Sequence, residues 1–164
     1  MSSIDGVLFD IDGVIVTSWH PIDGAPGAVG ELREQGLRRA FLTNTTSRTR
    51  DEIAAKLRAA GVEVDIDEIV TAARLTAEYL RAHHPKARVW VLNSGDIATD
   101  LEGIELDDAN PDVVVIGGAG AEFTHRTLSR VVELMLDGIP VVAMHSGMMW
   151  ATDDGLRIDT GAYL

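Results

Sequence analysis

Residues 7–14 read VLFDIDGV, and this stretch decides how the rest of the chain is interpreted. Three apolar residues run into two aspartates one residue apart, Asp10 and Asp12, and the stretch closes on Gly13 and Val14. A strand buried on both faces is apolar throughout. We therefore expect both aspartates to lie where a buried strand leaves its sheet, in position for chemistry. The structural alternative is an exposed turn capped by an aspartate side chain.

Composition limits what the chain can do. Its 164 residues fit one domain of common size or two small lobes, and a hydrophobic content of 46% is enough for a buried core. The formal net charge of −12 disfavours nucleic acid and anionic membrane surfaces as partners. There is no cysteine, no apolar run of membrane-spanning length and no signal-peptide pattern at the start. These features predict a cytoplasmic protein.

Apolar and amphipathic segments alternate along the chain. After the first strand we predict a loop at 17–24 and then a helix at 25–35, a strand at 37–43, a helix at 49–61, a short strand at 68–71 and a helix at 72–83. The pattern then restarts, with strands at 89–92, 113–116 and 141–143 and helices near 97–102 and 127–137. Alternation of this kind predicts an α/β fold built on parallel sheets with right-handed crossovers.

Two polar clusters follow neighbouring strands of the first lobe. One is Asp10 and Asp12, and the other is Thr43-Asn44-Thr45-Thr46, which precedes a helix. Ligands of open α/β sheets gather at the carboxyl ends of strands, and a helix N-terminus favours anions. Paired carboxylates suit Mg²⁺, and the hydroxyl and amide groups suit phosphate oxygens. We therefore predict a phosphoryl-transfer site, with Asp10 as nucleophile and Asp12 as general acid and base. Ordinary helix capping is the alternative for the threonine cluster.

These motifs resemble those of the haloacid dehalogenase superfamily of phosphatases. Residues 9–14 (FDIDGV) look like its first motif and residues 42–44 (LTN) like its second. Residues 26–28, 67–71 and 153–156 resemble a branch that carries a large α/β cap after the second motif. That branch includes the N-acetylglucosamine operon phosphatase, 4-nitrophenylphosphatases and the phospholysine phosphohistidine inorganic pyrophosphate phosphatase. The resemblance implies half of a Rossmann-like parallel-sheet core at 1–72, followed by an α/β cap lobe at 73–164.

The resemblance also implies roles for single residues. Asp10 would be the nucleophile and Asp12 the general acid and base. Asp10 and the backbone carbonyl of Asp12 would bind Mg²⁺, and Thr43 and the backbone at Asn44 would bind phosphate. The family further uses a lysine and an acidic pair that follow the cap in this branch. The only lysines here are Lys56 and Lys86, neither in the matching context. We therefore expect a chain truncated after the cap and inactive by itself.

Two further segments imitate functional motifs. The run 89–96 (VWVLNSGD), with Asp100 beyond it, mimics the missing acidic motif, but too few residues separate Lys86 from Asp96 for the usual helix. We interpret it as a cap strand followed by a helix start that contains an aspartate. The segment 117–120 (GGAG) lacks the full spacing of a dinucleotide loop, and we interpret it as a turn.

Residues 145–150 (HSGMMW) follow the third cap strand. His145 and Trp150 are candidates for contacting the substrate's leaving group, with packing inside the cap as an equal alternative. The resemblance implies small phosphorylated metabolites as substrates and a homodimer formed through the cap.

Two other functions remain open at this stage. One is a non-catalytic phosphate-binding or regulatory module. The other is a receiver-like phosphoacceptor domain, which needs a lone aspartate at the end of a later strand, whereas here the second strand ends in Thr43-Asn44.

Overall fold

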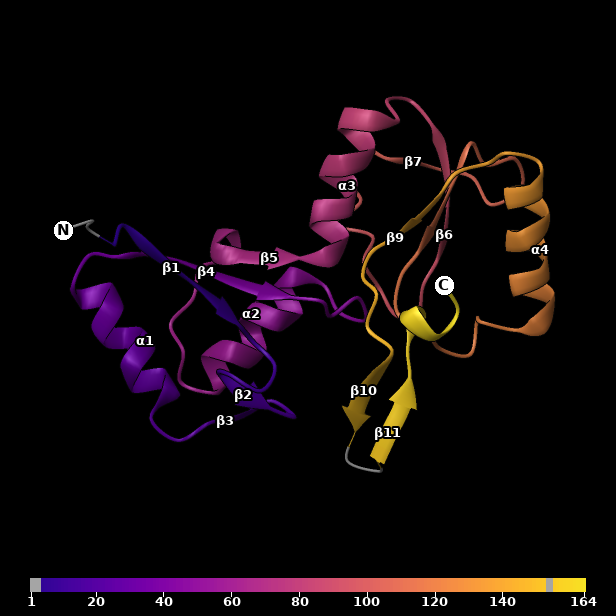
Figure 1. Ribbon diagram of the computed structural model, residues 1–164. Helices are drawn as coiled ribbons and strands as arrows, with labels where there is room; N and C mark the ends of the chain where they lie inside the picture. The colour runs from indigo at the N-terminus through magenta and orange to yellow at the C-terminus, as the bar shows by residue number, and fades with distance from the viewer. Residues whose placement is uncertain (1–3, 153–154) are drawn as a thin grey trace. The chain divides into compact units, whose positions relative to one another are not determined.

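The computed structural model describes residues 4–152 and 155–164. The chain divides into two compact units (Figure 1). Of the described residues, the first contains 4–43 and 50–71, and the second contains 44–49, 72–152 and 155–164. The chain therefore crosses between the units after Thr43, after Thr49 and after Thr71.

The first unit is built on a three-stranded parallel sheet in the order β1-β4-β5. Its elements in chain order are β1 (Gly6–Asp10), β2 (Val16–Thr17), β3 (His20–Pro21), α1 (Ala25–Glu34), β4 (Arg38–Thr43), α2 (Arg50–Ala59), the 3₁₀ helix η1 (Ile66–Glu68) and β5 (Ile69–Thr71). Central β4 places Phe41 in a core with Ile53 and Leu57 of α2, all fully buried. The predicted strand-helix alternation of this lobe is confirmed.

The prediction that β1 is buried on both faces is wrong. In the part of the chain that the structure describes, β1 pairs only with β4, so it is an edge strand with alternating exposure. Leu8 is 71% exposed, whereas Phe9 turns inward and stacks on Phe41 with ring centroids 5.5 Å apart. The predicted loop at 17–24 contains the short hairpin β2–β3, whose two turn residues Ser18 and Trp19 both have positive φ.

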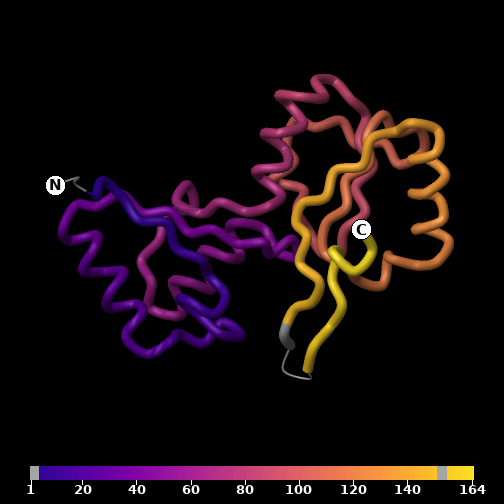
Figure 2. The backbone as a smooth tube through the Cα atoms, in the orientation of Figure 1, coloured from indigo at the N-terminus to yellow at the C-terminus, as the bar shows by residue number. Residues whose placement is uncertain are grey.

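The second unit is a three-layer arrangement around a four-stranded parallel sheet in the order β7-β6-β8-β9 (Figures 1 and 2). Its elements are α3 (Ala72–His83), β6 (Arg88–Leu92), β7 (Glu105–Leu106), β8 (Val113–Ile116), α4 (His125–Leu136), β9 (Val141–Ala143), β10 (Met149–Thr152), β11 (Gly155–Ile158) and the 3₁₀ helix η2 (Thr160–Ala162). Strands β10 and β11 form a separate antiparallel hairpin.

The central strand β8 explains why this sheet forms. All four of its residues are buried, as expected of a parallel strand covered on both faces. Val113 and Val115 pack with Leu80 of α3, and Val114 and Ile116 pack with Val131 of α4. Each such side chain stabilises the fold by about 1.5–3 kcal/mol relative to exposure.

The helix predicted at 97–102 is wrong. The structure has turns there, followed by the unpredicted strand β7. Ile97 and Leu101 are buried at helical spacing, which produced the helical signal. Two turn features bound this segment. At its start the Asp96 carboxylate accepts from the Ala98 N–H, and at its end Gly103 adopts φ +79°. The stretch between them is too short to propagate a helix.

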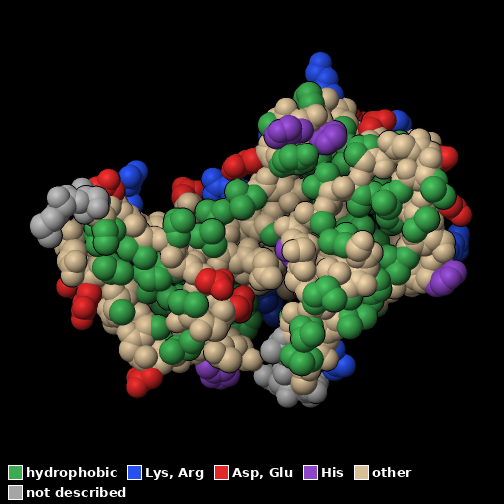
Figure 3. Space-filling model, viewed as in Figure 1, with side chains coloured by type: hydrophobic (Ala, Val, Ile, Leu, Met, Phe, Trp, Pro, Cys, Tyr) green, Lys and Arg blue, Asp and Glu red, His purple; other side chains and the backbone are tan. Residues whose placement is uncertain are grey.

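Exposed apolar side chains gather on the β10–β11 hairpin (Figure 3). Met149, Leu156 and Ile158 are 58%, 69% and 61% exposed. Of the segment 153–156 that contributed to the resemblance, Asp153 and Asp154 lie outside the described residues. No helix in the described ranges has both the length and the apolar character needed to cross a bilayer.

Candidate active site

Asp10 and Asp12 flank a buried anchor. Asp10 is the last residue of β1, and the next residue, Ile11, is fully buried in the core of the first unit. Ile11 also donates its N–H to the Leu42 carbonyl at 3.1 Å, which extends the β1–β4 ladder by one step. Because neighbouring side chains of an extended chain point to opposite sides, burial of Ile11 leaves both aspartates exposed. This alternation explains why a single buried residue, Ile11, separates Asp10 from Asp12.

The loop after Asp12 is held by backbone hydrogen bonds. Gly13 adopts φ +80° and donates to the Val16 carbonyl at 2.8 Å, and Ile15 donates to the Ile11 carbonyl at 3.0 Å. Ile15 is buried like Ile11, so two apolar anchors fix the loop at both ends. Glycine suits position 13 because few L side chains adopt that backbone conformation. The Asp10 carboxylate accepts from the Ile11 N–H at 2.9 Å.

Thr43 joins the two aspartates from the neighbouring strand. The β1–β4 register pairs Asp10 with Leu42, so Thr43 lies one step beyond Asp10 at the carboxyl end of the sheet. The Thr43 hydroxyl donates to the Asp12 carboxylate over 3.4 Å, and Thr43 is only 6% exposed. Three of the residues predicted for the site are therefore brought together within the first unit.

Asn44 is placed differently. The first unit ends at Thr43 in this region, and residues 44–49 belong to the second unit. The predicted phosphate ligands Thr43 and Asn44 are thus adjacent in sequence but lie on either side of a crossing between the units.

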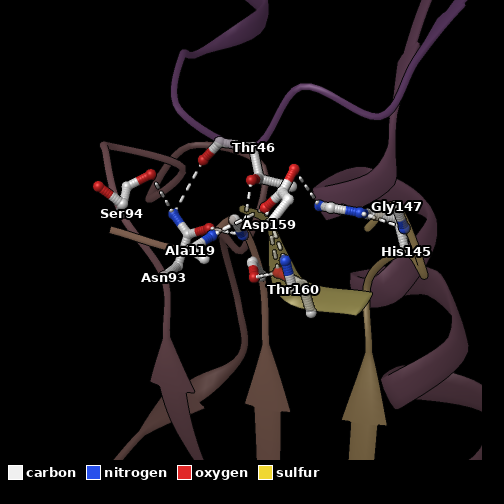
Figure 4. A network of polar contacts seen from close by, with 10 residues as sticks. Thr46, Asn93, Ser94, Ala119, His145, Gly147, Asp159 and Thr160 are labelled. Carbon is white, nitrogen blue, oxygen red and sulfur yellow. Dashed lines mark hydrogen bonds and ion pairs between the residues drawn. The ribbon is translucent and has the colours of Figure 1, made fainter. Parts of the chain in front are cut away.

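His145 lies in a polar network of the second unit (Figure 4). Its side chain is 9% exposed, its Nε2 lies 3.9 Å from Asp159 Oδ2, and its Nδ1 accepts from the Gly147 N–H at 3.2 Å. Asp159 also accepts from the Ala119 and Thr160 N–H groups at 3.0 and 2.8 Å. No sequence pattern around Asp159 marks it as part of a site, because its contact with the Ala119 N–H joins residues 40 positions apart.

Trp150 is on β10 and is 49% exposed. His145 and Trp150, predicted together, therefore differ in setting, one buried among polar groups and the other on the half-exposed hairpin. The segment 117–120 is a loop after β8, as predicted, and the N–H groups of Gly118 and Ala119 are occupied by side chains of the same unit.

The donor atoms at the aspartate site are carboxylate and hydroxyl oxygens, which are the ligands that Mg²⁺ prefers. Within residues 4–152 and 155–164, no three or more histidine, aspartate or glutamate side chains come together as a metal-binding group. Asp10 and Asp12 therefore fit as part of a magnesium site by donor type.

Comparison with known proteins gives the family. The profile of the haloacid dehalogenase-like hydrolases matches residues 7–107, and the chain belongs to this family. It is 28% identical to phospholysine phosphohistidine inorganic pyrophosphate phosphatase from Danio rerio, over 100% of this chain and 62% of that protein. It is likewise 28% identical to sugar-phosphatase AraL from Bacillus subtilis (strain 168), over 97% of this chain and 60% of that protein.

A solved structure confirms the fold. The p-nitrophenyl phosphatase from Archaeoglobus fulgidus matches with a TM-score of 0.89 and 28% identity, covering 99% of this chain and 63% of that one. The chain thus spans about three fifths of the length of these relatives. The α/β class and the resemblance to the family are confirmed.

Proposed function

We propose that the protein containing this chain is a Mg²⁺-dependent phosphatase of small phosphorylated metabolites. The observation that carries the proposal is the meeting of Asp10, Asp12 and Thr43 at one edge of a parallel sheet. The family supports it, since the relatives named above are phosphatases by name. The first unit and the second unit correspond in our proposal to the core and the cap.

The proposed reaction has two steps. In the first, a carboxylate oxygen of Asp10 forms a bond to phosphorus while the bond from phosphorus to the leaving oxygen breaks, and Asp12 donates a proton to that oxygen. In the second, Asp12 takes a proton from a water whose oxygen attacks phosphorus. The phosphorus bond to Asp10 then breaks, which releases phosphate and restores both aspartates.

The remaining groups would position the phosphate and offset its negative charge. In our proposal the single hydroxyl hydrogen of Thr43, donated to Asp12 in this structure, passes to a phosphate oxygen when the substrate binds. The Asp10 carboxylate and the backbone carbonyl of Asp12 would hold Mg²⁺, which when bound would offset the negative charge that otherwise keeps a carboxylate from a phosphate. In the second unit, Asn44 would bind phosphate, and His145 and Trp150 would contact the leaving group.

The test is Asp10→Asn in the full-length protein. Hydrolysis of an aryl phosphate should fall to the level of a blank, and mass spectrometry of quenched wild type should find the phosphoryl adduct on Asp10. Asp23→Asn is the matched control, because Asp23 is an exposed loop aspartate of the same unit. Full activity of Asp10→Asn, or an adduct on another residue, would remove Asp10 from its role.

The 164-residue chain by itself should bind phosphate without turning over substrate. Neither a third acidic ligand nor a lysine in the family context is found among the described residues. The same finding favours the second candidate, a module that binds phosphate without hydrolysis. Turnover of an aryl phosphate by the full-length protein would exclude that candidate.

A further inference from the structure

The segment 44–49 is attached to the second unit at several points, and these contacts carry our inference. The backbone carbonyl of Thr46 accepts from Asn93 Nδ2 at 2.8 Å, and the Thr46 hydroxyl accepts from the Gly118 N–H at 2.8 Å. Asn93 Oδ1 accepts from the same Gly118 N–H, also at 2.8 Å. Asn93 therefore joins the loop after β8 to the segment 44–49 (Figure 4). Thr46 is 4% exposed, so these bonds are shielded from water.

Glycines let the segment approach this closely. A Cβ on Gly95 would lie 2.5 Å from Ser47 Cα and 2.6 Å from the Ser47 carbonyl oxygen, which are backbone atoms that cannot turn aside. A Cβ on Gly118 would overlap the Thr46 hydroxyl, and one on Gly117 would overlap the Asn93 side chain. The segment thus packs closely against the glycine-rich loop after β8. The N–H groups of Gly118 and Ala119 in that loop already donate to side chains of the same unit.

The attached segment begins at Asn44, directly after Thr43 of the first unit. We propose that Asn93 is a positioning residue. Together with Gly95 and Gly118 it holds the segment 44–49 against the rest of the second unit and so sets the position of Asn44. We call this attachment the lock. Asn44, a phosphate ligand in our proposed function, is then held by contacts within the second unit. The second part of this inference rests on the proposed function, and the lock itself does not.

The first test measures the lock on the 164-residue chain by amide hydrogen exchange. Gly95→Ala should speed exchange at residues 44–49, while Gly103→Ala should not. Gly103 is the matched control because it has a similar positive φ, +79° against +98°, but nothing lies within 4 Å of its added Cβ. Both variants place an alanine at a positive φ, which strains the backbone, but only the Cβ of Gly95→Ala meets another residue, Ser47.

Asn93→Asp is a milder probe of the same lock. Aspartate still accepts from the Gly118 N–H but cannot donate to the carbonyls of Thr46, Ser94 and Gly95. Loss of the bond to Thr46 alone should raise exchange at 44–49 by about 2- to 12-fold, and loss of the two longer bonds should add to that rise. Asn110→Asp, at an exposed loop position, is its control. Equal exchange at 44–49 in the probe and control variants would overturn the lock.

The second test measures positioning in the full-length protein. Asn93→Asp and Gly95→Ala should raise the inhibition constant of inorganic phosphate and the KM of an aryl phosphate more than they lower kcat, because Asn44 is displaced but Asp10 and Asp12 are not. Faster exchange with an unchanged phosphate constant would overturn the positioning role. Absence of any turnover in wild type would instead count against the proposed function, and the exchange result would still decide the lock.

Discussion

Thr43→Val tests the central geometry most directly. Valine keeps the approximate shape of threonine and removes only the hydroxyl. The lost bond to Asp12 is 3.4 Å long, against a usual 2.7–2.8 Å for hydroxyl donors, so this bond contributes to folding only about 0.5 kcal/mol, the lower end for such bonds. A hydrogen bond to a phosphate anion contributes about 1.5–3 kcal/mol. We therefore expect phosphate affinity to fall by about 10- to 150-fold while the fold persists.

The assay is the inhibition constant of inorganic phosphate against aryl phosphate hydrolysis, measured with the full-length protein. Thr71→Val is the matched control, since Thr71 ends the neighbouring strand β5, pairs with Thr43 in the β4–β5 register and is 1% exposed. The control should leave the inhibition constant within about twofold, the scale of an unrelated substitution. Equal losses in both variants would show that the hydroxyl of Thr43 does not contact phosphate, and would refute the assignment.

The remaining predictions concern charged pairs. The Arg39 side chain is 3% exposed and donates to both carboxylate oxygens of Glu68 at 2.9 and 3.1 Å. Because Glu68→Ala leaves this buried charge unpaired, it should lower the free energy of unfolding of the first unit by about 3 kcal/mol, measured by urea unfolding. The double variant with Arg39→Met should recover most of that loss. An undiminished loss in the double variant would contradict this explanation. In the second unit, hydrogen bonds from Arg88 lower the pKa of Asp112 from 3.8 to about 2. Because the folded pKa is the lower one, the stabilisation is present above pH 3.8 and is lost as the pH falls toward 2. An NMR titration of Asp112 should show this pKa, and Arg88→Ala should raise it toward 3.8.

The sequence predicted the aspartate site because its physical cause is local. Carboxyl ends of parallel strands meet at one edge of a sheet, so polar residues that end two successive strands come together whatever follows them. Asp12 and Thr43 are 31 residues apart and still meet, because each ends or follows a strand that could be recognised from its own residues. The same reasoning located β4, β5, β6, β8 and β9.

The network of the second unit could not be predicted in this way. It draws single residues from separate loops, such as Thr46, Asn93 and Asp159, and no periodicity links them. The edge position of β1 was missed for a related reason. Burial of a strand depends on its neighbours in the sheet, and the residues of β1 alone do not show which of its edges is paired.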